Sequence, residues 1–273
     1  MLRWLGVAVA VPGLVVVGLV LGSLLASGGG SGATVAGGYA GVRAGRPAAG
    51  VVALASAPAW QSVVANVEGR DALVYRARGA RRPWRRYSNP TAQRTPLVFL
   101  VRGRVGSWLR VMLPSRPNGS EGWVRAAGME LRTDSYSVLV DLRDRRLTVR
   151  RRDRVVLATA VGAGRAATPT PSGLYYVAEL LRQPDPNGLY GPWAFALSAH
   201  SSVLTHFSGG DGQVGIHGTD EPAGIGHTVS HGCIRVRNGV IDRLAEILPL
   251  GTPVRIVASA HSRAPRAAEF TRT

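Results

Sequence analysis

Lysine is absent from the 273 residues and cysteine occurs once, and both scarcities limit what the protein can be. The single thiol, Cys233, excludes an intramolecular disulfide framework and any zinc module built from several cysteines. Because lysine is absent, all 33 basic residues are arginine, and the formal net charge is +17. Because 45% of the residues are hydrophobic, the chain can bury a core, and intrinsic disorder is excluded.

Charge is missing from one long stretch near the start. The 22 residues from Leu5 to Ala26 hold no charged side chain, and about 20 apolar residues cross a bilayer as a helix. We therefore predict an N-terminal transmembrane helix within residues 1–26, acting as a membrane anchor. A signal segment cleaved near residue 28 is the alternative. Arg3 is the only charged residue before Arg43, so the remainder of the chain is expected outside the cytoplasmic membrane, in the cell envelope.

The rest of the chain divides by composition into four parts. Residues 27–59 read as a Gly/Ala-rich linker, and residues 259–273 as a flexible tail. Between them, residues 60–132 predict a small antiparallel β-barrel or sandwich module, and residues 133–258 a β-sandwich or barrel domain with one C-terminal helix. The predicted class is therefore mainly β.

Short β-type runs separated by Gly, Pro and Asn turns predict the strands. In the second domain, Asn238 is expected to cap the helix, with an apolar face at Ile241, Leu244, Ala245 and Leu248 before Pro249. The strands are expected at residues 97–101, 108–113, 122–126, 136–142, 146–151, 154–161, 173–180, 193–198, 203–207 and 253–257.

The positive charge is concentrated in the middle of the chain. Residues 60–132 hold 14 Arg against 4 acidic residues, whereas residues 133–258 hold 13 against 11. An extracytoplasmic location excludes nucleic acid as a partner and leaves anionic wall polymers or lipid head groups. A compositional preference for arginine on a solvated surface is the alternative.

Three histidines and the only cysteine lie within 17 residues: His217, His227, His231 and Cys233. If residues 230–235 are extended, His231 and Cys233 share one face, with Gly232 between them. A thiol has an ordinary pKa of about 8.5, and a neighbouring imidazolium lowers it, which makes a cysteine nucleophile. A buried, inert cysteine is the alternative, but the cluster on turn-rich backbone favours catalysis.

Two segments of this cluster resemble a known family. They are Ile216-His217-Gly218 and Ser230-His231-Gly232-Cys233-Ile234-Arg235. They are similar to the L,D-transpeptidases of the YkuD type, whose pattern is His-Gly at a strand end followed by Ser-His-Gly-Cys, a hydrophobic residue and Arg or Asn. Upstream, residues 168–173 resemble the family's Thr-Pro-x-Gly turn with one extra residue. Residues 60–132 are similar to the Src-homology-like module that precedes this domain in actinobacterial wall enzymes.

The resemblance implies a cysteine-dependent acyl transfer between peptidoglycan stem peptides. Cys233 would attack the third residue of a tetrapeptide donor and release the terminal D-alanine, with His217 as base and the Gly218 carbonyl orienting it. The backbone N–H groups of His231, Gly232 and Cys233 would form the oxyanion hole. A diamino-acid amine of a neighbouring stem would then resolve the thioester. No cofactor and no metal are implied.

The remaining site residues carry less defined roles. Thr219, Ser230 and Arg235 are expected to contact substrate, Arg235 through a carboxylate, with a structural pair to Asp220 or Glu221 as its alternative. His231 either lines the donor site or orders the loop.

Three rival functions stay open. Water in place of the amine would give an L,D-carboxypeptidase with the same residues. His217, His227, His231 and Cys233 could instead hold zinc. A non-catalytic wall-binding protein is the third alternative, although it has no use for an exposed thiol.

Overall fold

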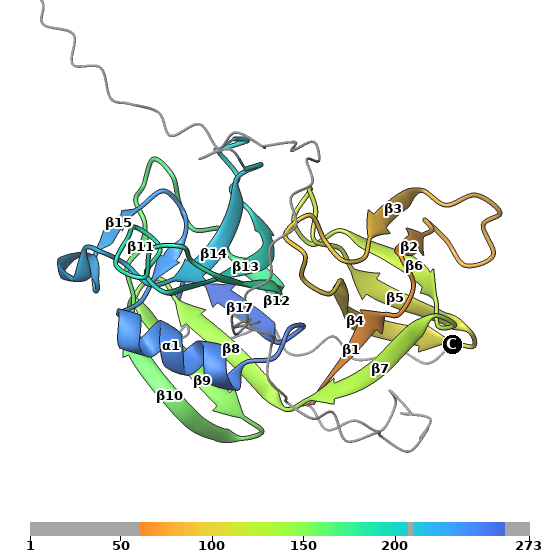
Figure 1. Cartoon of the computed structure of the whole chain (residues 1–273), viewed down its shortest axis with the longest axis horizontal. Coiled ribbons are helices and arrows are strands. Elements are labelled where there is room, and N and C mark those ends of the chain that lie inside the picture. The colour runs from red at the N-terminus through yellow and green to blue at the C-terminus, as the bar shows by residue number, and fades with distance from the viewer. Residues whose placement is uncertain (1–60, 207–209, 260–273) are drawn as a thin grey trace, which may run out of the picture. The chain divides into compact units, whose positions relative to one another are not determined.

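The computed structural model describes residues 61–206 and 210–259. The predicted membrane segment 1–26, the linker 27–59 and the tail from residue 260 onward lie outside the described residues. Within these ranges, no helix is long and apolar enough to span a membrane. The described part is mainly β with one α-helix, as predicted (Figure 1).

The first domain is antiparallel throughout. Its five-stranded sheet has the order β6-β5-β4-β1-β7, and a bridge between Tyr75 and Trp123 links β6 to the β2–β3 hairpin. Its core buries Phe99, Leu109 and Val124 at 0% exposure. The strands are β1 (Ser62–Val67), β2 (Asp71–Val74), β3 (Arg85–Ser88), β4 (Val98–Val105), β5 (Trp108–Met112), β6 (Glu121–Arg125) and β7 (Met129–Asp134), so the last strand extends slightly past the predicted boundary at residue 132.

The second domain is built on an eight-stranded mixed sheet of order β10-β9-β8-β17-β12-β13-β14-β16. The pairs β17–β8 and β14–β16 are parallel, and the other neighbours are antiparallel. A parallel pair, β11–β15, lies beside it. The strands are β8 (Tyr136–Asp141), β9 (Arg146–Arg151), β10 (Arg154–Ala160), β11 (Ala163–Gly164), β12 (Gly173–Arg182), β13 (Trp193–His200), β14 (Gln213–His217), β15 (Thr228–Ser230), β16 (Ile234–Arg235) and β17 (Pro253–Val257).

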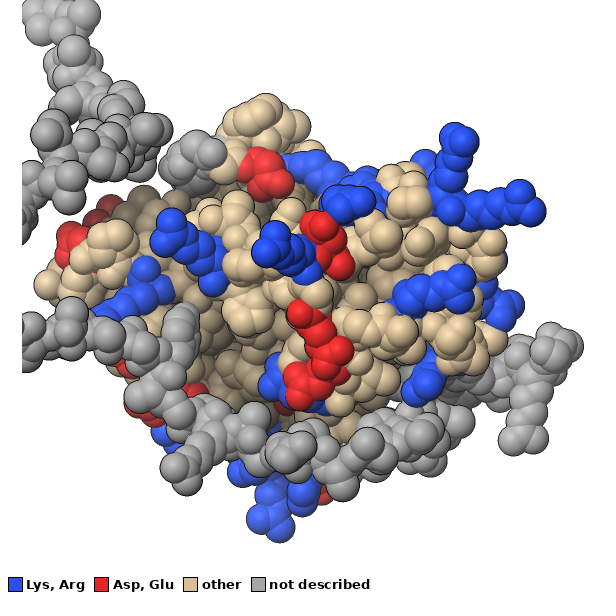
Figure 2. Space-filling model, turned by 45° about the vertical axis from the view of Figure 1, so that its right-hand side comes forward, with Lys and Arg blue, Asp and Glu red and all other residues tan. Residues whose placement is uncertain are grey.

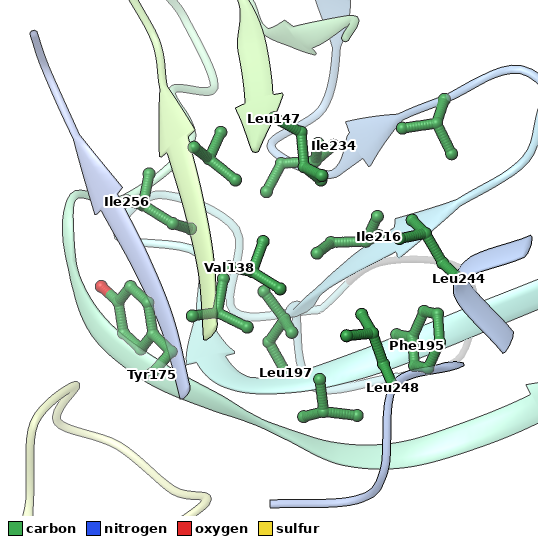
Figure 3. Close-up of a cluster of buried hydrophobic side chains, with 14 of the residues drawn as sticks. Val138, Leu147, Tyr175, Phe195, Leu197, Ile216, Ile234, Leu244, Leu248 and Ile256 are labelled. Atoms are coloured by element: carbon green, nitrogen blue, oxygen red, sulfur yellow. The ribbon is translucent and has the colours of Figure 1, made fainter. Parts of the chain in front are cut away.

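Alternation of apolar residues decides which face of this sheet is buried. Val138 and Val140 in β8 and Leu147 and Val149 in β9 are 0–2% exposed, because residues two apart in a strand point to the same face. Figure 3 shows the labelled members of this core converging from strands and helix alike. Burying each such side chain contributes about 1.5–3 kcal/mol.

Helix α1 (Asn238–Ile247) closes the core over β13 and β14. Ile241 and Leu244 are fully buried as expected, and Leu248 caps the carboxyl end (Figure 3). The predicted cap at Asn238 is wrong, because Arg237 occupies the cap position without a side-chain bond. The Asn238 carboxamide instead accepts a hydrogen bond from the N–H of Thr219, 2.8 Å away.

One predicted strand, residues 203–207, does not form over its described residues 203–206. The hydroxyl of Ser201 accepts hydrogen bonds from the N–H groups of Val203 and Leu204, at 3.2 and 3.0 Å, which bends the chain into a turn. The carbonyl of Leu204 accepts from Arg116 at 2.8 Å rather than from a neighbouring strand. Local side-chain bonding therefore competes successfully with strand pairing here.

The two domains share a small apolar cluster. Val64, Val98, Leu100 and Met112 of the first domain pack with Tyr176 of the second. The hydroxyl of Tyr176 donates to the Val98 carbonyl at 3.2 Å, and this side chain is fully buried. Tyr176 is thus a core residue between the two domains.

Arginine dominates the surface charge. Several guanidinium groups of the first domain stack on tryptophan, with Arg125 lying 3.9 Å from the Trp108 ring centroid and Arg76 lying 4.4 Å from that of Trp84. Figure 2 shows arginines over one face, with carboxylates among them in the middle and left of the view. Binding of anionic polymers by this domain stays a prediction.

Candidate active site

Strand register brings the cysteine close to the histidine strand. β14 and β16 pair in parallel, with Ile216 opposite Ile234 and His217 opposite Arg235. Cys233 directly precedes β16, and the backbone N–H of Gly215 donates to its Sγ at 3.4 Å. His217 is the last residue of β14. The two residues singled out in the sequence therefore come from adjacent strands of one sheet edge.

The segment just before Cys233 is a tight turn, so the extended geometry considered for residues 230–235 is not adopted there. Gly232 has φ +122°, which a residue with a side chain rarely adopts. The Ser230 hydroxyl donates to the Cys233 carbonyl at 2.6 Å and accepts from the Gly232 N–H at 3.1 Å. His231 is exposed, whereas Cys233 is half-buried, and the turn between them replaces the alternation of an extended strand.

His217 is held in one orientation by the backbone. Its Nδ1 donates to the Gly218 carbonyl at 2.6 Å, the contact that the sequence resemblance implies. With Nδ1 donating, Nε2 of the neutral ring is the acceptor. The Tyr190 ring packs edge-on against the imidazole, with centroids 4.8 Å apart and planes at 67°. This contact leaves the histidine only 3% exposed.

A cavity of about 250 Å³ contains both reactive candidates. His217 and Cys233 share it with the start of β14, the middle of β13 and Tyr190. Its lining consists of Leu181, Tyr190, Ala194, Phe195, Ala196, Gly210, Asp211, Gly212, Gln213, Val214, Gly215, His217 and Cys233. The cavity is a concave, largely apolar site with one thiol and one imidazole, which suits a covalent reaction on a peptide.

Burial sets the charge state of the pair. Burial, aided by the nearby Arg235 charge, lowers the pKa of His217 to about 4, while the Gly218 bond and the Asp220 charge oppose the shift. Burial also raises the pKa of the Cys233 thiol, opposed in part by the Gly215 N–H and the Arg235 charge. The predicted lowering of the thiol pKa by an imidazolium is therefore wrong for the resting site, which holds a neutral thiol and a neutral imidazole.

Comparison with known proteins assigns the second domain. The sequence model of YkuD, the L,D-transpeptidase catalytic domain, matches residues 135–256. The YkuD L,D-transpeptidase of Bacillus licheniformis is 38% identical over 124 residues, covering 45% of this chain and 67% of that protein. This chain belongs to the L,D-transpeptidase family. The YkuD protein of Bacillus subtilis is 36% identical over 124 residues with the same coverage of 45% and 67%.

Two solved structures are similar to part of this chain. Bd1075 of Bdellovibrio bacteriovorus is 30% identical with a TM-score of 0.38, covering 46% of this chain and 49% of that one. The catalytic domain of the E. faecium L,D-transpeptidase is 24% identical with a TM-score of 0.33, covering 45% of this chain and 96% of that one. The family match begins at residue 135, so the Src-homology-like assignment of the first domain stays a prediction.

Arg235 of the L,D-transpeptidase domain is already paired. Its Nη1 lies 2.8 Å from Oε2 of Glu221, whose side chain is 68% exposed, while Arg235 is 8% exposed. The structural pair considered for this residue is thus present with Glu221, and the substrate contact stays a prediction. Nε of Arg235 is buried and finds no partner among residues 61–206 and 210–259, and the charge of the group acts on both Cys233 and His217.

Two of the expected substrate contacts have their polar atoms turned inward. Ser230 is 1% exposed and its hydroxyl serves the turn around Gly232. Thr219 is 3% exposed, and its Oγ1 accepts from the Glu221 N–H at 3.0 Å. Both residues lie within the L,D-transpeptidase site, but their contacts fit a positioning role better than substrate binding.

The zinc alternative lacks a ligand cluster in the part of the chain that the structure describes. Within it, no three His, Cys, Asp or Glu side chains stand where they could hold one metal ion. His217 and Cys233 line the cavity, but His227 is exposed, and Nε2 of His231 contacts Nη2 of Arg165 instead.

Four residues that matter to this site escaped the sequence analysis. Gly215 contacts Cys233, and Tyr190 contacts His217. Arg165 contacts His231, and Asn238 holds the loop that follows His217. Gly215 is only two residues before His217, so the period of a strand ending at the His-Gly pair could have found it. The other three come from distant segments and carry no local pattern.

Proposed function

We propose that this chain is a peptidoglycan L,D-transpeptidase that forms cross-links between the third residues of two stem peptides through a thioester at Cys233. The observation that carries the proposal is the shared cavity, in which a thiol and a backbone-oriented neutral imidazole are the chemically reactive groups. Membership of the L,D-transpeptidase family supports the choice of reaction. A peptidoglycan substrate in turn supports the predicted extracytoplasmic location.

Acylation begins from neutral groups. As Sγ of Cys233 attacks the carbonyl carbon of the donor's third residue, Nε2 of His217 takes the thiol proton. The resulting imidazolium then gives this proton to the nitrogen of the departing D-alanine, and the C–N bond breaks. Because burial lowers the pKa of His217 to about 4, its imidazolium is a strong acid, which favours rapid transfer to the leaving amine.

Resolution of the thioester repeats these transfers in reverse. The neutral side-chain amine of an acceptor diamino acid attacks the thioester carbonyl, His217 takes the extra proton from nitrogen, and the C–S bond breaks. The proton then returns to the Cys233 sulfur, which restores the neutral pair. The Gly215 N–H, which donates to Sγ, stabilises negative charge on sulfur when it departs.

One hydrogen bond removes a donor from the oxyanion hole that the resemblance implies. The N–H of Gly232 donates to the Ser230 hydroxyl, so this group is committed to the turn. Of the three donors that the resemblance implies, we keep the backbone N–H of Cys233 as the proposed donor to the tetrahedral oxyanion. Each donor of this kind contributes about 3 kcal/mol to the transition state.

The direct test is the product made from purified stem tetrapeptides. The full chain should release D-alanine and give a cross-linked dimer that mass spectrometry detects, and the Cys233→Ala variant should do neither. Release of D-alanine with tripeptide but without dimer would support the L,D-carboxypeptidase alternative. Binding of cell walls without any release would support the non-catalytic alternative and refute the proposal.

A further inference from the structure

A loop of the first domain, residues 115–118, forms hydrogen bonds with the segment that leads into β14. The guanidinium of Arg116 donates to the carbonyls of Ser201, Leu204 and Asp211 at 2.6, 2.8 and 3.0 Å. One side chain thus gathers three backbone acceptors of the L,D-transpeptidase domain. A planar, permanently charged group with five donors suits this task, whereas a lysine ammonium does not.

Asn118, two residues after Arg116, adds two more hydrogen bonds between the domains. Its Oδ1 accepts from the His200 N–H at 2.8 Å, and its Nδ2 donates to the His200 carbonyl at 2.7 Å. The carboxamide therefore occupies the place of a strand neighbour at the end of β13.

The loop of residues 115–118 is itself held in place by hydrogen bonds within the first domain. Arg85 donates to the Ser115 hydroxyl at 2.8 Å and to the Arg116 carbonyl at 3.2 Å. The Tyr87 hydroxyl lies 2.9 Å from that of Ser115. Because β3 supplies both side chains, the position of Arg116 is tied to the sheet framework of its own domain and not to a loose tip.

The segment that leads into β14 forms one wall of the Cys233 cavity. Asp211 and Gly212 line that cavity, and β14 with Gly215 and His217 follows directly. Gly212 has φ +77°, and a Cβ there would lie 2.1 Å from the Leu204 carbonyl oxygen and 3.0 Å from Nη2 of Arg116. The wall is therefore closely packed against the arginine, so that loss of the guanidinium leaves it without its three-carbonyl support.

We propose that Arg116 and Asn118 are positioning residues through which the first domain shapes the donor-binding wall of the Cys233 cavity. The inference rests on the proposed transpeptidase function and extends it to residues outside the L,D-transpeptidase family match. It gives the first domain a role within catalysis that does not depend on its net charge.

A wall that positions the donor differs from a merely structural contact in its kinetic effect. The wall residues Asp211 and Gly212 flank the cavity, whereas the reacting groups are Cys233 and His217. Losing the wall should therefore weaken donor binding and leave the reactivity of the thiol nearly unchanged. A small alkylating agent such as iodoacetamide does not need the wall, and Cys233 is the only thiol in the chain.

The test compares Arg116→Ala, Arg116→Lys and Asn118→Ala with Arg86→Ala as the matched control. Arg86 is an arginine of the same domain whose ion pair with Asp71 stays within that domain. For Arg116→Ala we expect KM for the tetrapeptide donor to rise about tenfold, with kcat and the iodoacetamide rate within about threefold of wild type. Asn118→Ala should act in the same direction, and Arg116→Lys should recover only part of the loss.

Donor binding is measured separately from turnover in a Cys233→Ala background. There, adding Arg116→Ala should weaken tetrapeptide binding by the same factor as KM, which keeps this test apart from the chemistry of the proposed function. Unchanged binding, or equal loss of donor acylation and alkylation, would overturn the positioning role. A wild-type chain that binds tetrapeptide but makes no product would refute the proposed function alone.

Discussion

The backbone N–H of Gly215 donates to Sγ of Cys233 across 3.4 Å, from a position two residues before His217 on the same strand. β14 therefore serves the site twice, with a backbone donor for the sulfur and an imidazole for its proton. Burial nevertheless keeps the resting thiol neutral, and this state has measurable consequences.

The pH dependence of Cys233 alkylation should show a neutral pair. Because burial raises the thiol pKa, the iodoacetamide rate should keep rising above pH 9 and should have no plateau between pH 6 and 7. Donor acylation should stay active down to about pH 5, because His217 remains an unprotonated base until its pKa of about 4 is approached. Stopped-flow acylation and mass spectrometric labelling give both profiles. Rapid alkylation at pH 6–7 would instead identify a thiolate–imidazolium pair.

His217 should make the fold sensitive to acid. Its pKa falls from 6.5 to about 4 on folding, so the unfolded chain binds the proton first as pH drops. Stability is then fully present above pH 6.5 and declines toward pH 4, by about 3 kcal/mol in total for this group. His217→Gln, which stays uncharged, should lose about 2–3 kcal/mol less between pH 7 and 4.5 in denaturant titrations. Parallel curves for the two chains would contradict this account.

Removing the Asn238 carboxamide should disturb the His217 loop. Asn238→Ala leaves the buried N–H of Thr219 without its acceptor, at a cost of about 1–3 kcal/mol. We expect a lower free energy of unfolding and a lower kcat, since the Gly218 carbonyl that orients His217 lies beside this bond. Asn187→Ala, at an exposed position, is the control. An Asn238→Ala chain with wild-type stability would exclude the anchoring role.

Ser230 should act on the turn and not on substrate. Ser230→Ala removes the donor to the Cys233 carbonyl and the acceptor of the Gly232 N–H, so kcat should fall by about tenfold or more with KM nearly constant. Steady-state kinetics with Ser202→Ala as an exposed control decide the matter. A rise in KM at constant kcat would restore the substrate contact predicted from the sequence.

The sequence could single out the candidate reactive residues because their pattern is local. His217, Gly218 and Cys233 lie in two short segments, and the strands around them alternate clearly. Charge states were not predictable in this way, since burial depends on Tyr190 and on strands far along the chain. The cap at Asn238 failed because its side chain bonds to distant backbone, which no local pattern reveals. The strand expected at 203–207 is replaced over 203–206 by a turn that the nearby Ser201 hydroxyl holds and that the distant Arg116 also contacts.

The parallel pairing of β14 with β16, and not the length of the segment that connects them, sets the position of Cys233. A parallel pair needs a crossover connection, and here residues 218–233 supply it. Ile234 need only stay opposite Ile216 for Cys233 to meet the Gly215 N–H. Residues 222–225 of this crossover bond locally, the Gly224 N–H to the Glu221 carbonyl and the Ile225 N–H to the Pro222 carbonyl, so this short turn is where the chain can change length while the β14–β16 register and the Glu221–Arg235 pair are kept.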